Sequence, residues 1–214
     1  DLGVCSLAVL YDSANAYSEG VAQVFAQTVR QLGGQVIMES YLTGETDFTA
    51  HLARIRDAGA RAVFFPNMPE DLKHQIPLFR NMGFSDICLG TDIWQSGSLL
   101  RLEGFDGCLF STYYSPSCLN ERGKKFSKVF QDAYGLTPNN AAAATYDTFM
   151  LLRDVLRRSD VRSHASLRDA LAGSGVFEGV TGHTVFQGSG DPLKSAYVVR
   201  VKDGHEELFK EVRP

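Results

Sequence analysis

The sequence predicts an α/β protein built on a doubly wound parallel sheet. Short apolar, β-branched or aromatic runs alternate with longer stretches of helical period over the first half of the chain. Glycines follow the helical stretches, and polar turns follow the apolar runs. This alternation is typical of βαβ units, in which each helix returns the chain to a parallel neighbouring strand.

Five strands are expected in the first half, with helices between them. The strands are SLAVLY, QVIMESY, AVFF, ICLG and GCLFSTYY. The first helix is expected at 18–32, with Val21, Val24, Phe25, Thr28, Val29 and Leu32 on one apolar face and Gly33 and Gly34 at its end. Five parallel strands with four crossovers make a half of about 112 residues, which lies within the usual range for a domain.

The other crossovers show helix signals too. The second helix is expected to be capped by Thr46 or Asp47, to bury Phe48, Leu52 and Ile55, and to end at Gly59. In PEDLKHQIPLFRNMGF, Pro69 suits a first helical turn and Pro77 is expected to kink the helix. A short helix is expected at 96–102, with Ser96 as its cap.

The pattern changes after Thr112. Three helices are expected in NERGKKFSKVFQDAYG, in a longer segment after Pro138 and in HASLRDALAGSG, the first with Phe126, Val129, Phe130 and Ala133 facing inward. The glycine-punctuated end predicts short antiparallel strands with a turn at Asp203 and Gly204. No strand is expected in 113–175, so those helices lack an obvious sheet of their own.

Composition excludes several classes of protein. A formal net charge of −4 with scattered Lys and Arg argues against nucleic acid as a partner. No apolar run reaches the roughly 20 residues of a membrane span, and the first residues carry no signal-peptide pattern, so any export signal is expected upstream. Of the four cysteines, Cys5, Cys88 and Cys108 are expected to be buried free thiols, and Cys118 is expected to be accessible. The sequence does not decide whether two of the four form one disulfide bridge.

Motifs for catalysis, metals or cofactors are not found. The five histidines have no metal-ligand spacing and are expected to be solvated. AGSGV and QGSGDP lack the strand and helix that flank a serine nucleophile, and no GxGxxG follows a strand. The sequence therefore predicts no enzyme, no metal site and no cofactor.

The order of several segments resembles one family. LAVLYDSANAYSEGVAQVF, GETDFTAHLARIRDAGARAVFFP, LGTDIW, YYSP, AAAATYDTFMLL and FEGVTGHTVFQGSGDPLKSAYVVRVKDG follow one another along nearly the whole chain. Together they resemble the type I periplasmic binding proteins of the branched-chain amino acid (leucine/isoleucine/valine) class. That resemblance implies two doubly wound lobes joined by three hinge crossings, which close on a ligand.

The chain departs from this pattern because it begins at the strand that opens the second lobe. By the resemblance, residues 1–112 and 196–214 form lobe two and 113–195 form the rest of lobe one, without its first sheet, so the chain is expected to be a fragment. Helices made to cover a sheet would then expose Phe126 and Phe130, which predicts repacking, disorder or self-association.

The function implied is that of an extracytoplasmic solute-binding protein of an ABC importer, periplasmic or extracellular. It would capture an amino acid or a related small carboxylate and deliver it to the importer permease. The alternatives are a ligand-binding sensor domain of the same fold and a doubly wound enzyme.

Candidate ligand-binding residues lie after three strands, where open parallel sheets form their crevice. In SANAYS, Asn15 is expected only to cap the helix, whereas Tyr17 at the loop tip buries little unless a ligand packs on it. The resemblance places a ligand-binding tyrosine there. Asp92 in GTDIW matches the family acid that pairs with the ligand ammonium; its alternative role, as a helix cap, suits Ser96 better.

Three further candidates have strong structural alternatives. In PNMPED, Asn67 offers an amide and Met68 an apolar wall where relatives often carry an aromatic residue, but the two prolines equally suit a rigid turn. Trp94, the only tryptophan, is either a pocket wall or a core residue, with core packing slightly favoured.

Overall fold

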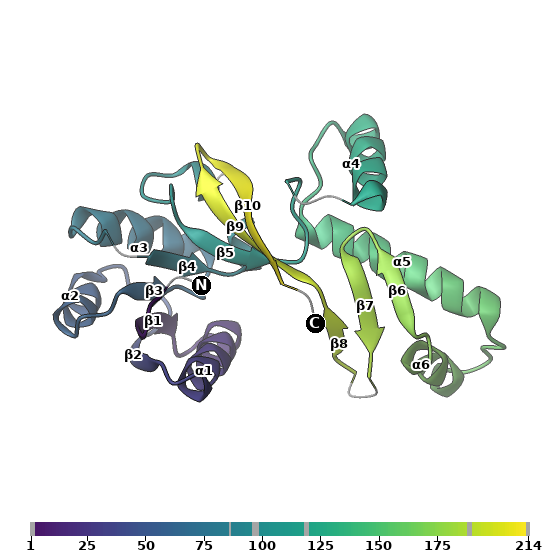
Figure 1. Ribbon diagram of the computed structural model, residues 1–214, viewed down its shortest axis with the longest axis horizontal. Coiled ribbons are helices and arrows are strands. Elements are labelled where there is room, and N and C mark those ends of the chain that lie inside the picture. Colours follow the sequence, from purple (N-terminus) through teal and green to yellow (C-terminus); the bar gives the residue numbers. More distant parts are fainter. Residues whose placement is uncertain (1–2, 86, 96–98, 118–119, 188–189, 213–214) are drawn as a thin grey trace. The chain divides into compact units, whose positions relative to one another are not determined.

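A computed structural model describes residues 3–85, 87–95, 99–117, 120–187 and 190–212 of the chain (Figure 1). The chain divides into two compact units. Unit 1 comprises Asp1–Phe110 and Arg200–His205, and unit 2 comprises Ser111–Val199 and Glu206–Pro214. Whether these units correspond to the two lobes inferred from the resemblance stays a prediction, and each unit is described by itself.

The large sheet confirms the predicted fold class. Its strands are β1 (Ser6–Asp12), β2 (Gln35–Tyr41), β3 (Ala62–Phe64), β4 (Ile87–Gly90), β5 (Leu109–Thr112), β9 (Ala196–Lys202) and β10 (His205–Val212). They lie in the order β10-β9-β5-β4-β3-β1-β2, and the pairs β1–β2, β1–β3, β3–β4 and β4–β5 are parallel. The five strands expected in the first half therefore form a doubly wound parallel sheet.

The crossovers of unit 1 are helical. They contain α1 (Ala16–Gln31), α2 (Thr49–Asp57), α3 (Pro69–Asn81) and two 3-10 turns, η1 (Asp92–Gln95) and η2 (Leu99–Arg101). Pro69 begins α3 as predicted, and α3 runs through Pro77 without a break. Of the short helix expected at 96–102, the structure describes the 3-10 turn η2; residues 96–98, with the expected cap Ser96, lie outside the described residues.

Two details of α1 and α2 differ from expectation. Small side chains, Ala22 and Ala26, form the buried face of α1, whereas Val24 and Leu32 are 65% and 82% exposed. Val21 and Phe25 of the predicted face still pack against the core, so that face is confirmed in part. In α2, Phe48 itself takes the cap position, although the Asp47 carboxylate still accepts the N–H of Thr49 at 2.9 Å.

The core of α2 follows the prediction. Phe48, Leu52 and Ile55 are fully buried. Tyr41 of β2 packs edge-on against Phe48, with ring centroids 5.0 Å apart. This contact fixes α2 on the neighbouring strand.

Unit 2 contains helices and a small antiparallel sheet. The helices are α4 (Glu121–Tyr134), α5 (Asn140–Arg158) and α6 (His164–Ala172), and β6 (Val176–Gly179), β7 (Gly182–Phe186) and β8 (Pro192–Lys194) form the sheet. Between β9 and β10, Asp203 and Gly204 have φ of 51° and 73°, which confirms the predicted turn. In the described residues of 113–175 no strand forms, also as expected.

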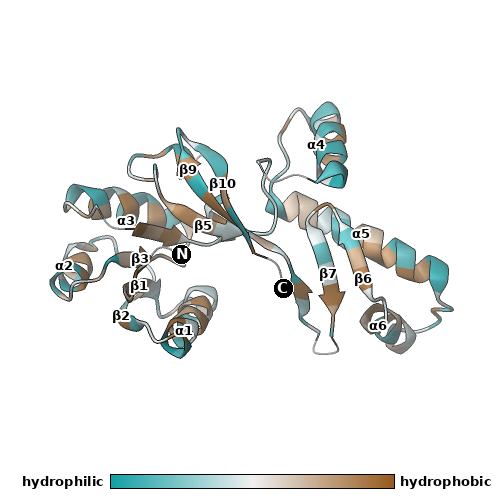
Figure 2. Cartoon of the chain, in the orientation of Figure 1, coloured by the Kyte–Doolittle hydropathy of each residue, from teal (hydrophilic) through white to brown (hydrophobic). Residues whose placement is uncertain are grey.

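Phe126 faces inward as the helix pattern predicted, and the exposure expected for a helix without its sheet does not occur. Its ring is 8% exposed and packs with Tyr114, Ala143 and Val180. Phe130 is half-buried against this cluster, while Val129, expected to face inward, is 59% exposed. Figure 2 shows the resulting mixture of hydrophobic and hydrophilic residues along α4.

The cysteines differ in part from expectation. Cys88 and Cys108 are buried free thiols, as predicted. Cys5 is exposed and lies just before β1 begins at Ser6, outside the strand, so that prediction is wrong. Cys118 lies outside the described residues.

Candidate functional site

The carboxyl ends of β1, β3 and β4 bring three of the predicted loops together in unit 1. β1 leads into α1, β3 into α3 and β4 into η1. Because neighbouring strands β1–β3 and β3–β4 are parallel, the loops that follow them emerge at the same edge of the sheet. The candidate residues from all three loops therefore belong to one region.

Tyr17 and Asp92, 75 positions apart, meet at this edge. The Tyr17 hydroxyl donates to Asp92 Oδ1 at 3.3 Å. Both side chains are half-buried. The structure thus pairs the two residues that the sequence singled out most strongly.

Tyr17 lies in the first turn of α1, not at a loop tip as expected. The Asn15 side chain accepts the N–H groups of Tyr17 at 3.0 Å and Ser18 at 3.1 Å. This confirms Asn15 as the helix cap, with the side-chain oxygen satisfying donors that the helix itself leaves unpaired. The cap fixes the backbone from which the Tyr17 ring projects.

Asp92 opens η1, and only Thr91 separates it from the end of β4. Its carboxylate meets a phenolic hydroxyl in a half-buried position. A carboxylate in such a site attracts a cation more strongly than a fully solvated carboxylate does, because the effective dielectric constant around it is lower. An ammonium group can bind to both oxygens, because it can donate one N–H to the carboxylate and another to the phenolic oxygen.

Asn67 is fully buried, and its amide is used within the protein. Its Nδ2 donates to the Leu10 carbonyl at 2.9 Å and to Gln75 Oε1 at 2.8 Å. Its Oδ1 accepts the Ser18 hydroxyl at 2.8 Å. The exposed fraction of Asn67 is 0%, so these contacts favour a structural role over direct ligand contact.

Trp94 and Met68 occupy different environments. Trp94 is fully buried, donates its indole N–H to the Phe65 carbonyl at 3.3 Å and packs edge-on against Phe105. The structure therefore places Trp94 in the core, the role that was slightly favoured. Met68 is half-buried in the extended position before α3, which leaves part of its side chain accessible.

Several polar residues around this site were missed in the sequence. Asp12 is 3% exposed and accepts the Ala14 N–H at 2.9 Å and the Thr43 hydroxyl at 2.5 Å. Thr91, next to Asp92, is 5% exposed, and its hydroxyl has no hydrogen-bond partner among the residues that the structure describes. The sequence signal for both was their position at the end of a strand, since Asp12 ends β1 and Thr91 follows β4.

His51 contradicts the expectation that the histidines are solvated. Its two ring nitrogens lie 2.6 Å from Glu39 Oε1 and 2.6 Å from Glu45 Oε1, and its side chain is 12% exposed. Arg54 adds an ion pair to Glu39 at 2.5 Å. Hydrogen bonds from Arg54 and His51 outweigh the effect of burial and lower the pKa of the Glu39 carboxyl. The cluster joins β2 to α2.

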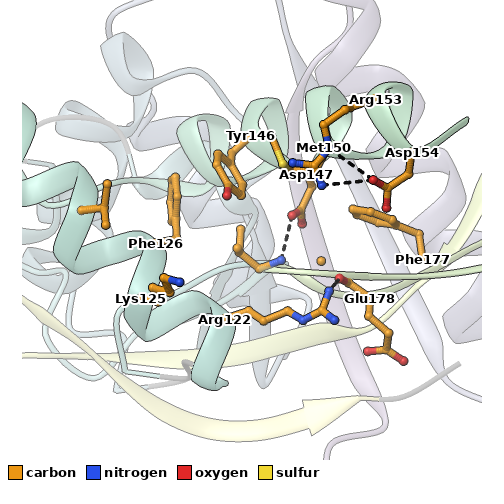
Figure 3. Close-up of a pocket in the computed structure, with 13 residues that line it drawn as sticks. Arg122, Lys125, Phe126, Tyr146, Asp147, Met150, Arg153, Asp154, Phe177 and Glu178 are labelled. Carbon is orange, nitrogen blue, oxygen red and sulfur yellow. Dashed lines mark hydrogen bonds and ion pairs between the residues drawn. The ribbon is translucent and has the colours of Figure 1, made fainter. Parts of the chain in front are cut away.

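Unit 2 contains a cavity of its own, of about 280 Å³ (Figure 3). Phe126, Tyr146, Met150 and Phe177 contribute apolar walls, and Asp147 points toward the β6–β7 turn. Asp147 accepts the N–H groups of Val180 at 2.7 Å and Thr181 at 2.9 Å, and the Thr181 hydroxyl at 2.6 Å. This carboxylate therefore holds the turn in place.

The described residues offer little for other kinds of site. Among them, no group of three or more His, Cys, Asp or Glu side chains is arranged to hold a metal ion. No helix in the described part of the chain is both long and apolar enough to cross a membrane. The half-buried Tyr17–Asp92 pair stays the main candidate.

A family model described as "Periplasmic binding protein" matches residues 1–206. The chain belongs to this family. A curated relative, the Leu/Ile/Val-binding protein homolog 2 of Brucella abortus, is 24% identical over 211 residues, which are 95% of this chain and 56% of the relative. The chain therefore spans just over half the length of that relative, as expected for a fragment.

Solved structures of the family share the fold. A leucine-binding protein of Thermotoga maritima is 27% identical, with a TM-score of 0.90 over 100% of this chain and 62% of that one. A branched-chain amino acid transporter substrate-binding protein of Streptococcus pneumoniae, in complex with isoleucine, is 24% identical with a TM-score of 0.82 and the same coverage. A solute-binding protein of R. palustris in complex with benzoate is 18% identical, with a TM-score of 0.83 over 99% of this chain and 59% of that one.

These comparisons confirm the family and the fold class that the sequence indicated. The relatives are substrate-binding proteins, several of them named for amino acids. They give no support to self-association of this chain.

Proposed function

We propose that this chain supplies one wall of the binding site of an amino-acid-binding protein. In this site the Asp92 carboxylate and the Tyr17 hydroxyl hold the α-ammonium group of the ligand. The distance of 3.3 Å between the two oxygens is the observation that carries the proposal. It puts an anionic acceptor and a neutral oxygen within reach of one small cation.

The chemistry of the pair supports an amino acid over a simple carboxylic acid. An ammonium bound at Asp92 neutralises the carboxylate and forms charge-assisted hydrogen bonds, which are roughly twice as strong as neutral ones. A deaminated acid keeps the carboxylate but lacks the ammonium, so no positive charge pairs with Asp92 or offsets the repulsion between the two carboxylates. Half-buried Met68, on the neighbouring loop, suits contact with an apolar ligand side chain.

The longer protein would act as the solute-binding component of an ABC importer. Family relatives whose names include leucine, isoleucine and valine support this role. The partner would be the importer permease, the location would be periplasmic or extracellular, and the protein would bind its ligand without chemical turnover. One wall alone should bind weakly, because ordering a ligand costs free energy that few contacts recover.

An NMR titration of the chain with leucine and with 4-methylpentanoate, its deaminated analogue, tests the proposal. Leucine should shift the amide signals around Tyr17 and Asp92 with a dissociation constant of roughly a millimolar, and the analogue should bind at least about tenfold more weakly. Asp92→Asn should remove the preference, because it removes the charge and keeps the shape. Equal binding of both ligands to the unaltered chain would contradict the proposal.

A further inference from the structure

The segment Phe65–Asn67, between β3 and α3, contacts both loops that carry the candidate site. On one side, Asn67 Oδ1 accepts the hydroxyl of Ser18, the residue after Tyr17, at 2.8 Å. On the other side, the Phe65 carbonyl accepts the indole N–H of Trp94, two residues after Asp92, at 3.3 Å. One short segment is thus bonded to the neighbours of both candidate residues.

The Ser18 hydroxyl connects three elements. It is 0% exposed, accepts the backbone N–H of Asp12 at 3.0 Å and donates to Asn67. The first turn of α1 is thereby bonded to the end of β1 and to the loop after β3. A buried hydroxyl with both bonds made has little freedom, because breaking either bond leaves a polar group unpaired.

Asn67 has a single suitable orientation in this environment. Its amide hydrogens meet two acceptors, the Leu10 carbonyl and Gln75 Oε1, while its oxygen meets the Ser18 donor. Exchanging oxygen and nitrogen would put acceptors opposite acceptors. Asn67 therefore fixes the positions of β1, α1 and α3 relative to one another.

The Asp92 side is held by packing. The Trp94 ring fills the space beside Gly90, where an added Cβ would lie 2.1 Å from the ring. The indole also packs against Phe105, with ring centroids 5.2 Å apart. With Gly90 before Asp92 and Trp94 after it, the backbone that carries the carboxylate is held from both directions.

We infer that Asn67, through Ser18, is a positioning residue that holds Tyr17 at hydrogen-bonding distance from Asp92, with Trp94 fixing the opposite loop. This inference rests on the proposed function, since the ligand ammonium needs both oxygens at one spacing. Asn67 acts through its neighbours and does not touch the ligand. The hydrogen bonds of the Asn67 amide hold the Tyr17 side of the site in place, so the spacing between Tyr17 and Asp92 does not depend on those two side chains alone.

Affinity for leucine, measured by NMR titration, tests the inference with Asn67→Ala, Tyr17→Phe and the double variant. Each single change should weaken binding by about tenfold, and the double variant should lose less than about threefold more than Tyr17→Phe alone. Positioning of the Tyr17 hydroxyl has no further value once that hydroxyl is gone. The inference would be overturned if the loss of affinity in the double variant equalled the product of the two single losses, or if Asn67→Ala bound leucine as well as the unaltered chain does.

Asn139→Ala is the matched control. Asn139 caps α5 in unit 2 through the Ala142 N–H at 2.9 Å, so its loss destabilises the chain without touching this site. Leucine affinity should change by less than about twofold in this variant. A loss as large as that of Asn67→Ala would assign the Asn67 effect to general destabilisation and would also overturn the inference.

A readout without ligand separates this inference from the proposed function. Nuclear Overhauser contacts between the Tyr17 ring and the Asp92 methylene protons should be present in the free chain. They should weaken in Asn67→Ala and persist in Asn139→Ala, even if leucine fails to bind. Unchanged contacts in Asn67→Ala would overturn the positioning role. If Asn67→Ala does not fold, as Trp94 fluorescence and circular dichroism would show, Ser18→Ala replaces it with the same expected outcomes.

Discussion

Unit 1 buries its large aromatic residues, whereas unit 2 leaves several of them on its surface. Phe48, Phe65, Phe79 and Trp94 of unit 1 are all 0% exposed. Among the described residues, the exposed large aromatics all belong to unit 2: Tyr134, Tyr146, Phe149 and Phe209, between 37% and 67% exposed. Apolar burial is the main favourable term in folding, so the two units reach stability differently.

Their polar networks differ in a parallel way. In unit 1, buried polar contacts around Asn67 gather beside the candidate site. In unit 2, the buried Asp147 carboxylate joins α5 to the β6–β7 turn. The comparison indicates that unit 1 combines a complete core with a polar site, while unit 2 depends more on a few strong polar contacts.

Removing a large core side chain from unit 1 should have the largest effect on stability. Trp94→Ala should lower the free energy of unfolding by about 3–5 kcal/mol, because a fully buried ring leaves a cavity that the sheet cannot collapse to fill. Urea unfolding followed by far-ultraviolet circular dichroism measures the loss, since the variant lacks the fluorophore. Trp94→Phe should cost less because it keeps most of the volume. A loss below about 1 kcal/mol in Trp94→Ala would mean that unit 1 is packed no better than unit 2.

Removing the polar contact of unit 2 should have a somewhat smaller effect. Asp147→Ala should cost about 2–3 kcal/mol, because it leaves the N–H groups of Val180 and Thr181 buried without their acceptor. Amide hydrogen exchange should show faster exchange in β6 and β7 and little change in unit 1.

Asp154→Ala is the control for this prediction, since Asp154 lies on the same helix in a surface ion pair with Arg153 at 3.1 Å. Such pairs are typically worth about 0–1 kcal/mol. Equal losses in the two aspartate variants would show that the Asp147 contacts add no particular stability to unit 2.

The sequence was sufficient for the order of elements because strand and helix periods are local. The QVIMESY strand and the ICLG strand form with the predicted bounds, as β2 and β4. The face of α1 was predicted only in part, because Ala22 and Ala26 carry little hydrophobic signal although they are fully buried. Hydrophobic periodicity is dominated by bulky side chains, so it does not reveal which small side chains are buried against the sheet.

For the candidate site, residue types and strand ends were enough to select Tyr17 and Asp92. They were not enough to decide the role of Asn67, because its partner Ser18 lies 49 positions away and only the folded sheet brings them together. His51 was misassigned for the same reason, since Glu39 lies on a different element. Long-range partners decide whether a polar residue serves a ligand or the fold.

The smallest effect is expected on the surface of unit 2. Phe149→Ser on α5 should change the free energy of unfolding by no more than about 0.5 kcal/mol, because the ring is already 63% exposed and gives up little burial. Phe79→Ser provides the matched comparison in unit 1, where the same chemical change buries a hydroxyl in place of a fully buried ring and should cost several-fold more. Urea unfolding of both variants at two protein concentrations measures these differences. If Phe149→Ser cost more than about 1 kcal/mol, this face of α5 would be covered in solution; dependence on protein concentration would then identify a second copy as the cover, and the contrast between the two units would disappear.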